Sequence, residues 1–214
     1  MDFIFDPSLV LYLPLYKLDS ASFMSRDAYG HLCTVTGAVW QLNGSNFDGV
    51  DDIISLPLSF DTLTDLTLEA WINNPLDGDA VGMFWGFYKD ATHRIGIFTD
   101  RTGGAITAEL YIGSVKDVSS DAAPVADTWY HVVVLLGTGG IKMYVDTVAQ
   151  ADTDTSTLSF ADIAGMTEAQ LGKYVVADTA NVWKGKIGEA RLYSRRLSVV
   201  EITHNYDVTK WRYR

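Results

Sequence analysis

The acidic residues in the strand-like stretches decide whether the chain could hydrolyse a glycosidic bond. Retaining hydrolysis uses two carboxyl groups about 5 to 5.5 Å apart, and acidic residues at alternate positions of one strand would face the same way. At those positions each candidate glutamate has non-acidic neighbours: Thr67 and Trp71 around Glu69, Thr107 and Tyr111 around Glu109, and Ile187 and Arg191 around Glu189. The sequence therefore predicts no catalysis by this mechanism.

The histidines offer no catalytic group either. His31, His93, His131 and His204 are scattered along the chain, and the sequence has no Gly-x-Ser-x-Gly motif and no metal-binding histidine pair. His131 alternates with Trp129 along one strand-like stretch, which is typical of a hydrogen-bonded structural histidine. We therefore predict that the protein is not an enzyme.

Aromatic and polar residues around one predicted hairpin indicate ligand binding instead. Sugars have flat apolar faces edged by hydroxyl groups, so their sites combine an exposed aromatic ring with convergent polar groups. The predicted ligand-binding residues lie on two strands, on the loop between them and on a later segment: Trp85, Tyr88, Asp90, His93, Arg94 and Tyr174. Trp85 also belongs to the apolar run MFWGF, so a place in the core is the alternative for that residue.

Length and composition favour a single all-β domain. At 214 residues with 18 glycines, the chain has the size of many one-domain β-sandwiches and is rich in turn formers. Short alternating stretches with almost no helical periodicity predict a two-sheet antiparallel β-sandwich over residues 1–214. The apolar runs are far shorter than the roughly 20 residues that cross a bilayer, so membrane insertion is not expected.

The charge balance argues against one class of partner. Sixteen basic and 27 acidic residues give a formal net charge of -11 at pH 7. Such a surface repels phosphate backbones, and basic residues gather only at Arg195 and Arg196 and in the last five positions. Nucleic acid is therefore not an expected partner.

The strongest single pattern lies near the end of the chain. Residues 186–193 alternate in character as a half-buried strand would, and Ser198 followed by Glu201 forms a capping box, which predicts a short helical turn from Ser198. Further strands are expected at residues 9–15, 32–39, 66–72, 80–88, 94–99, 105–112, 115–118, 128–136 and 141–145. Residues 149–167 are rich in Asp, Thr and Ser and are expected to form a weakly structured surface connection.

Several of these stretches resemble one known family when taken in order. They are FDGVDDII at 47–54, LTLEAWI at 66–72, WYHVVV at 129–134, KMYVD at 142–146, Leu171-Gly172, and a closing Gly, acidic residue and Arg before Leu197-Ser198. The ordered set resembles the laminin G-like, concanavalin A-like lectin/glucanase jelly-roll domains. The resemblance implies a jelly roll that binds oligo- or polysaccharide. Thr147 departs from the pattern, because the family commonly has Gly there, so the form of that turn is left open.

The resemblance also implies a structural Ca²⁺ ion. Its ligands in such domains come from an early Gly-rich loop, the FDGVDD stretch and an acidic residue near the C-terminus. The matching positions are Asp27 with the backbone up to Gly30, Asp48 (or Asp51), and Glu189. Oxygen ligands from loops suit Ca²⁺, and the alternative is that Asp48 and Asp51 only build a turn.

A structural or adhesion module of a particle surface or fibre is the alternative to carbohydrate binding. An aromatic ring on a sheet face with open solvent in front of it would favour binding. The N-terminus shows no secretory signal pattern, whereas the resemblance favours an extracellular or particle-surface location, so the compartment is not decided.

Overall fold

We describe the protein from a computed structural model, in which residues 6–75, 81–100, 104–177 and 179–214 are placed well enough to discuss. The six predicted ligand-binding residues all fall within this part, whereas residue 80 of the predicted strand 80–88 lies outside it. Within it, no helix is long and apolar enough to cross a membrane.

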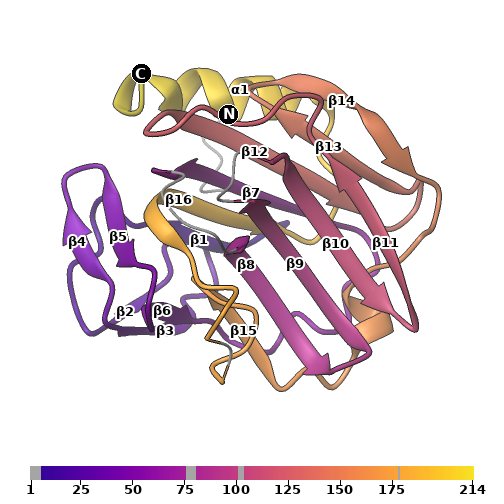
Figure 1. Cartoon of the computed structure of the whole chain (residues 1–214), viewed down its shortest axis with the longest axis horizontal. Coiled ribbons are helices and arrows are strands. Elements are labelled where there is room, and N and C mark those ends of the chain that lie inside the picture. The colour runs from indigo at the N-terminus through magenta and orange to yellow at the C-terminus, as the bar shows by residue number, and fades with distance from the viewer. Residues whose placement is uncertain (1–5, 76–80, 101–103, 178) are drawn as a thin grey trace.

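The described residues form two eight-stranded sheets stacked face to face, with every recorded pairing antiparallel. Sheet A has the order β14 (Val148–Asp154), β13 (Ile141–Val145), β12 (Trp129–Leu136), β7 (Leu66–Asn73), β16 (Lys184–Tyr193), β5 (Gly44–Asp48) and β4 (Val39–Gln41), with β1 (Leu9–Pro14) also paired to β16. Sheet B has the order β11 (Ser114–Ser119), β10 (Ile106–Ile112), β9 (His93–Asp100), β8 (Val81–Asp90), β15 (Glu168–Leu171), β6 (Ile53–Ser55), β3 (Leu32–Thr36) and β2 (Ser22–Met24). Figure 1 shows β8 to β11 side by side. The predicted jelly-roll sandwich is confirmed.

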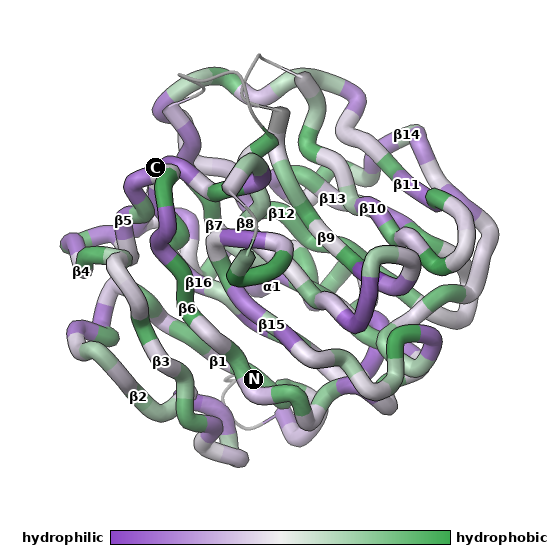
Figure 2. The backbone as a smooth tube through the Cα atoms, turned by 60° about the horizontal axis from the view of Figure 1, so that its bottom comes forward, coloured by the Kyte–Doolittle hydropathy of each residue, from purple (hydrophilic) through white to green (hydrophobic). Residues whose placement is uncertain are grey.

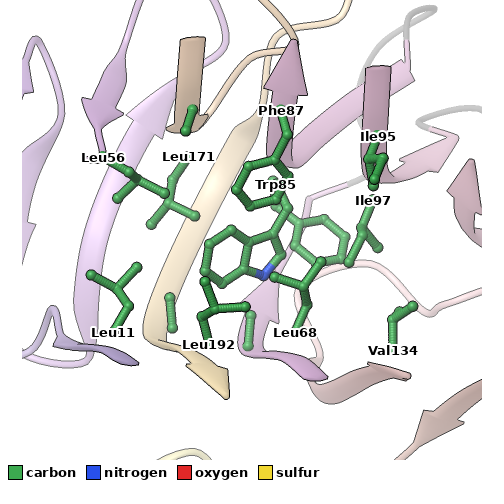
Figure 3. Packing of buried hydrophobic residues seen from close by; sticks show 14 of the residues in the cluster. Leu11, Leu56, Leu68, Trp85, Phe87, Ile95, Ile97, Val134, Leu171 and Leu192 are labelled. Carbon is green, nitrogen blue, oxygen red and sulfur yellow. The ribbon is translucent and has the colours of Figure 1, made fainter. Parts of the chain in front are cut away.

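The core lies between the sheets and is built from the inward side of each alternating strand. Leu68 and Leu192 contribute from sheet A, and Trp85, Phe87 and Ile97 face them from sheet B, all fully buried (Figure 3). Hydrophobic and hydrophilic residues are mixed along strands such as β9 and β10 (Figure 2). This period of two leaves the outer face of sheet B to polar and mixed residues.

The C-terminal helix α1 (Val199–Thr209), which continues into the short 3₁₀ helix η3 (Lys210–Arg212), packs on part of the outer face of sheet A, where it contacts β7. The capping box is confirmed: the Ser198 side chain accepts from the Glu201 amide, and the Glu201 carboxylate accepts from the Ser198 amide at 2.8 Å. The helix runs further than the short turn expected. The Trp71 indole donates to the Thr209 hydroxyl at 2.8 Å, so the helix is anchored on β7.

Two expectations about local structure need correction. The stretch 32–39 is not one strand, because at Gly37 (φ 78°) the chain leaves β3 in sheet B and enters β4 in sheet A. Residues 149–167 are more structured than expected: most of β14 pairs with β13 there, and the 3₁₀ helix η2 (Phe160–Ile163) buries Phe160 and Ile163. These outcomes depend on partners distant in sequence, which composition does not reveal.

The departure at Thr147 leaves a tight hairpin turn intact. Val145 pairs with Val148 across the turn, and its two central residues, Asp146 (φ 50°) and Thr147 (φ 74°), both lie in the left-handed region. Two-residue hairpin turns favour this conformation, even though a β-branched threonine adopts it at a cost.

A network of buried charges joins sheet A to α1. Glu69 of β7 lies opposite Arg191 of β16 and forms an ion pair with it, and both side chains are 1% exposed. The second oxygen of Glu69 accepts from Asn205 of α1 at 2.8 Å, and His131 Nε2 lies 2.9 Å from Oε1. Glu69 and Arg191 thus form a cross-strand ion pair, and His131 has the hydrogen-bonded structural role that the sequence predicts.

This network keeps Glu69 ionised. Burial alone would raise the pKa of Glu69, but Arg191, His131 and the hydrogen bonds from His131 and Asn205 lower it to about 2. Glu189 also pairs with Arg191, and it accepts from Arg212 at 2.8 Å and from the Tyr12 and Tyr213 hydroxyls at 3.2 Å. Both glutamates are therefore committed to structural partners.

Candidate functional site

Three rows of residues cross the outer face of sheet B from β8 through β9 to β10. Cross-strand pairing aligns Tyr88 with Arg94 and Tyr111, Gly86 with Gly96 and Glu109, and Met83 with Phe98 and Thr107. Each row is two positions from the next along β9 and β10, so all three rows face outward together. The middle row has glycines where its neighbours have large side chains.

The two glycines are required by the chain that lies over them. A Cβ atom on Gly86 would stand 2.0 Å from the Lys173 carbonyl oxygen, and one on Gly96 would stand 2.6 Å from Met83 Sδ and 3.1 Å from Tyr174 Cε2. The contact at Gly86 is with backbone and leaves no room for a side chain, whereas the contacts at Gly96 are with the flexible end of Met83 and the edge of the Tyr174 ring. The segment that follows β15 therefore rests on the sheet because Gly86 leaves room for the Lys173 carbonyl, and it brings Tyr174 onto this face beside Gly96.

The result is a hollow of about 340 Å³ on the outer face of sheet B. The described residues that line it are Val81, Met83, Tyr88, Arg94, Phe98, Glu109, Tyr174, Val175 and Asn181. Three of the six predicted ligand-binding residues, Tyr88, Arg94 and Tyr174, are thus brought together. Its volume lies at the lower end of the range for small-molecule sites.

Arg94 is held rigidly at the centre of the polar side of the hollow. Its Nη1 donates to the Ala91 carbonyl at 2.6 Å, and its guanidinium lies 4.6 Å from the Tyr111 ring centroid and 5.3 Å from that of Tyr174. Its Nη2 approaches Glu109 Oε1 at 3.8 Å. That separation is within ion-pair range but beyond hydrogen-bond length.

The Tyr174 hydroxyl is a buried polar group beside this pair. The residue is 7% exposed, and within the described part of the chain its hydroxyl makes no hydrogen bond of normal geometry. Burial and the Glu109 charge raise the pKa of Tyr174, so the group stays a neutral hydroxyl that can donate or accept. A buried polar group of this kind gains stability from a ligand that supplies its partner.

Trp85 needs correction, because its side chain lies in the core and not on the outer face. It is 0% exposed and its ring stacks on Phe87 with centroids 5.7 Å apart (Figure 3). Trp85 pairs with Ile97, and Tyr88 pairs with Arg94, so the two aromatics occupy opposite faces of β8. The alternative given for Trp85 is the one that the structure supports.

Asp90 and His93 are close to the hollow but do not line it. Both stand at the tip of the β8–β9 hairpin, where His93 Nδ1 lies 3.0 Å from Asp90 Oδ1 and the Thr92 amide donates to the same oxygen at 2.8 Å. Hydrogen bonds from His93 and Thr92 lower the pKa of Asp90 to about 2. These residues shape the turn that supplies the Ala91 carbonyl to Arg94.

Sequence reasoning overlooked several residues of the hollow as binding residues. In the sequence, Glu109 is a candidate only for a catalytic acid, and Met83, Phe98 and Asn181 carry no predicted role. Alternation along residues 94–98 and 107–111 is the signal that could have found Phe98 and Glu109, once the two strands were paired. Asn181 reaches the hollow from a connecting segment, for which the sequence gives no such signal.

The residues implied for Ca²⁺ do not converge, and this part of the expectation needs correction. Asp48 lies opposite Lys184 on β16, and Glu189 lies five positions further on, about 16 Å away at about 3.3 Å per residue. Glu189 already faces two arginines. Asp27 accepts from the amides of Tyr12, Tyr29 and Gly30 at 2.9 to 3.1 Å, which closes its loop.

Asp48 instead belongs to a group with Asp51 and Asp52, whose carboxylate oxygens lie within 4.8 Å of one another. Asp52 accepts from the Asp48 amide and Asp48 accepts from the Val50 amide, both at 2.8 Å. The turn-building role given as the alternative for Asp48 is therefore present. Burial and the charges of Asp48 and Asp51 raise the pKa of Asp52. The calcium itself stays a prediction.

We expect chelation to test it directly. If a Ca²⁺ ion binds only the folded state, a hundredfold excess over Kd stabilises the fold by about 2.7 kcal/mol, so a chelator should lower Tm by several degrees. Asp51→Asn should remove that difference, because Asp51 is exposed and belongs to the acidic group. An identical Tm with and without chelator, together with no calcium by elemental analysis, would leave the three carboxylates as turn residues.

Comparisons with known proteins show which solved structures and which family the chain resembles. A search of curated protein sequences finds no match. Trypanosoma rangeli sialidase in complex with sialic acid superposes with a TM-score of 0.77 at 16% identity, over 98% of this chain and 34% of the sialidase chain. Domain 4 of AbnA, a GH43 extracellular arabinanase from Geobacillus stearothermophilus, in complex with arabinotriose, superposes with a TM-score of 0.71 at 19% identity, over 92% of this chain and 97% of that domain.

These likenesses show the fold, and the chain spans about a third of the sialidase but nearly all of the arabinanase domain. The profile of the family described as the concanavalin A-like lectin/glucanases superfamily matches residues 48–203, which is well over half of the sequence. The chain belongs to the concanavalin A-like lectin/glucanases superfamily.

Proposed function

We propose that the protein is a non-catalytic carbohydrate-binding module and that its glycan occupies the hollow on the outer face of sheet B. The observation that carries this proposal is the juxtaposition of Arg94, Glu109 and the buried Tyr174 hydroxyl with apolar side chains around two glycines. The other two hollows recorded among the described residues, of about 330 and 390 Å³, have no arginine, glutamate or tyrosine in their linings.

The two kinds of lining residue match the two kinds of surface on a sugar. The side chains of Met83, Phe98 and Val175 offer apolar contact for ring C–H groups, while Tyr88 presents a partly exposed aromatic ring. Arg94 and Glu109 offer charged hydrogen-bonding groups, which form stronger bonds than neutral ones. Aromatic and charged groups in one hollow support a glycan ligand over a purely apolar one.

The solved relatives support the same class of ligand. The arabinanase domain that matches nearly end to end is in complex with arabinotriose, and the larger sialidase is in complex with sialic acid. Both ligands are sugars. The likeness to these proteins supports binding but does not identify the sugar.

The absence of a catalytic step is part of the proposal. Among the described residues that line the hollow, Glu109 is the one carboxylate, and it faces Arg94. Glu69 and Glu189, the other glutamates considered for catalysis, are buried under α1 and held by arginines. Two-carboxylate hydrolysis would require a second acid beside Glu109.

A glycan-array screen tests the proposed function, and Tyr88→Ala tests its location. We expect the wild-type protein to bind a defined set of oligosaccharides, and Tyr88→Ala to weaken binding of the best of them by about tenfold. Loss of a ring that contacts ligand costs on the order of 1 to 2 kcal/mol, and a tenfold change corresponds to about 1.4 kcal/mol. Isothermal titration calorimetry measures the change.

Tyr29→Ala is the matched control. Tyr29 is 56% exposed in the loop between β2 and β3, outside the hollow, so its removal should leave glycan affinity unchanged. Equal affinity in wild type and Tyr88→Ala would place the binding elsewhere. No binding to any glycan would support the structural or adhesion module instead.

A further inference from the structure

The charges in the hollow occur as a pair and not singly. Arg94 Nη2 and Glu109 Oε1 are 3.8 Å apart, with side chains 30% and 24% exposed. At this separation the cation and the anion largely cancel each other's field, yet they are too far apart to satisfy each other by a hydrogen bond. Each retains hydrogen-bonding capacity toward a third group placed between or beside them.

A hydroxyl group is the third group that fits such a pair. A guanidinium only donates hydrogen bonds and a carboxylate only accepts them, whereas a hydroxyl does both. One sugar hydroxyl can therefore accept from Arg94 and donate to Glu109 at once. A ligand carboxylate or sulfate would gain from Arg94 but would be repelled by Glu109, and it has no proton to donate.

Arg94 is held in place before any ligand arrives. Arg94 is fixed by the Ala91 carbonyl and by the Tyr111 and Tyr174 rings. Tyr174 is in turn fixed by the close approach of its segment to Gly86 and Gly96. Arg94 therefore has little freedom to turn away from Glu109 toward an anionic ligand, and preorganised groups lose little entropy on binding.

The remaining groups agree with an uncharged ligand. The Tyr174 hydroxyl is neutral and buried, and it can serve a second ligand hydroxyl. Over longer distances the formal net charge of -11 opposes the approach of polyanionic chains. The groups in the hollow and the net charge of the whole protein thus both disfavour anionic glycans.

We propose that the hollow selects uncharged glycans through adjacent hydroxyl groups, and that the Arg94–Glu109 pair discriminates against glycans that carry carboxylate or sulfate. The inference rests on the proposed function, because it names the class of glycan that the same hollow takes. Glu109 acts here as a specificity-determining residue.

The test uses matched glycans that differ only in charge, such as polygalacturonan and its fully methyl-esterified form, or lactose and sialyllactose, alongside arabinotriose as a neutral probe. We expect the wild-type protein to bind at least one neutral member and to bind its charged counterpart at least tenfold more weakly. Glu109→Gln should weaken binding of the neutral glycan by about tenfold, because a charged acceptor of its hydroxyl is lost. The variant keeps the size of the side chain but removes the charge that repels anions, so the preference for neutral over charged glycans should narrow or reverse.

Asp117→Asn is the matched control. Asp117 of β11 lies directly opposite Glu109 of β10, but its side chain is exposed and does not line the hollow. It should leave the preference unchanged, so a general charge effect would appear in both variants. Stronger or equal binding of charged glycans, or the same response in both variants, would overturn the selectivity while the proposed function stood. Failure of every neutral and charged glycan to bind would overturn both.

Discussion

Replacing Arg191 with methionine should destabilise the fold by about 3 to 5 kcal/mol. Arg191 is 1% exposed and neutralises Glu69 and Glu189, which are equally buried. Removing one partner of a buried ion pair leaves an uncompensated charge in a medium that solvates it poorly. Two carboxylates are left here, although Arg212 and His131 still reach them. Denaturant unfolding, followed by tryptophan fluorescence, measures the loss.

Arg214→Met is the control for that experiment. Arg214 also pairs with a carboxylate, Asp146, but its side chain is 42% exposed, and exposed pairs contribute about 0 to 1 kcal/mol. A loss below about 1 kcal/mol in both variants would contradict the description of the Glu69–Arg191 network as a buried anchor for α1.

Truncating Trp85 to alanine should destabilise the protein by a similar amount, about 3 to 5 kcal/mol, because a fully buried indole in the centre of the core leaves a large cavity. Glycan affinity of the folded fraction should stay close to that of the wild type, since the side chain faces away from the hollow. Urea titration and calorimetry at low temperature give the two quantities separately.

Trp211→Ala controls for loss of a tryptophan as such. Its side chain is 68% exposed on η3, so we expect a change in unfolding free energy within about 0.5 kcal/mol. If Trp85→Ala instead kept full stability and lost glycan binding, Trp85 would be a ligand-stacking residue and its placement in the core would be wrong.

The fold was predictable where the pattern is local. Ser198 and Glu201 specify the start of α1 by their own chemistry, and Leu68 alternates with Glu69 as a half-buried strand requires. The sequence could not show that the polar face of β7 would also be buried, with all eight residues inside the protein. That burial comes from α1, which packs against β7 from about 130 residues further along the chain.

The site was predictable in part, and the errors have a simple geometric source. Trp85 and Tyr88 are three positions apart, so a regular strand places them on opposite faces, and both could not stack on one sugar. The sequence gives no role to Gly86 and Gly96. In the structure, strand pairing places them side by side beneath the segment that contains Tyr174. Tyr174 lines the hollow together with Tyr88 and Arg94 because the segment after β15 lies against the hairpin.

The residues implied for Ca²⁺ do not converge in the structure, and the reason is different. Asp27, Asp48 and Glu189 match positions of a motif, but motif position does not show which partners a carboxylate has in this chain. Glu189 is held by two arginines and two tyrosines, and Asp27 by three backbone amides. Competing ligands of this kind become visible only in three dimensions.

Chemical-shift mapping by NMR with the best glycan from the array is the most direct test of the proposed site, since it locates the ligand without any substitution. The amides of Gly86, Gly96 and Tyr174, together with the side-chain signals of Arg94, should shift on titration and saturate at one common Kd. Shifts confined to residues outside the outer face of sheet B, with these four unchanged at saturation, would contradict the assignment of the hollow as the carbohydrate-binding site.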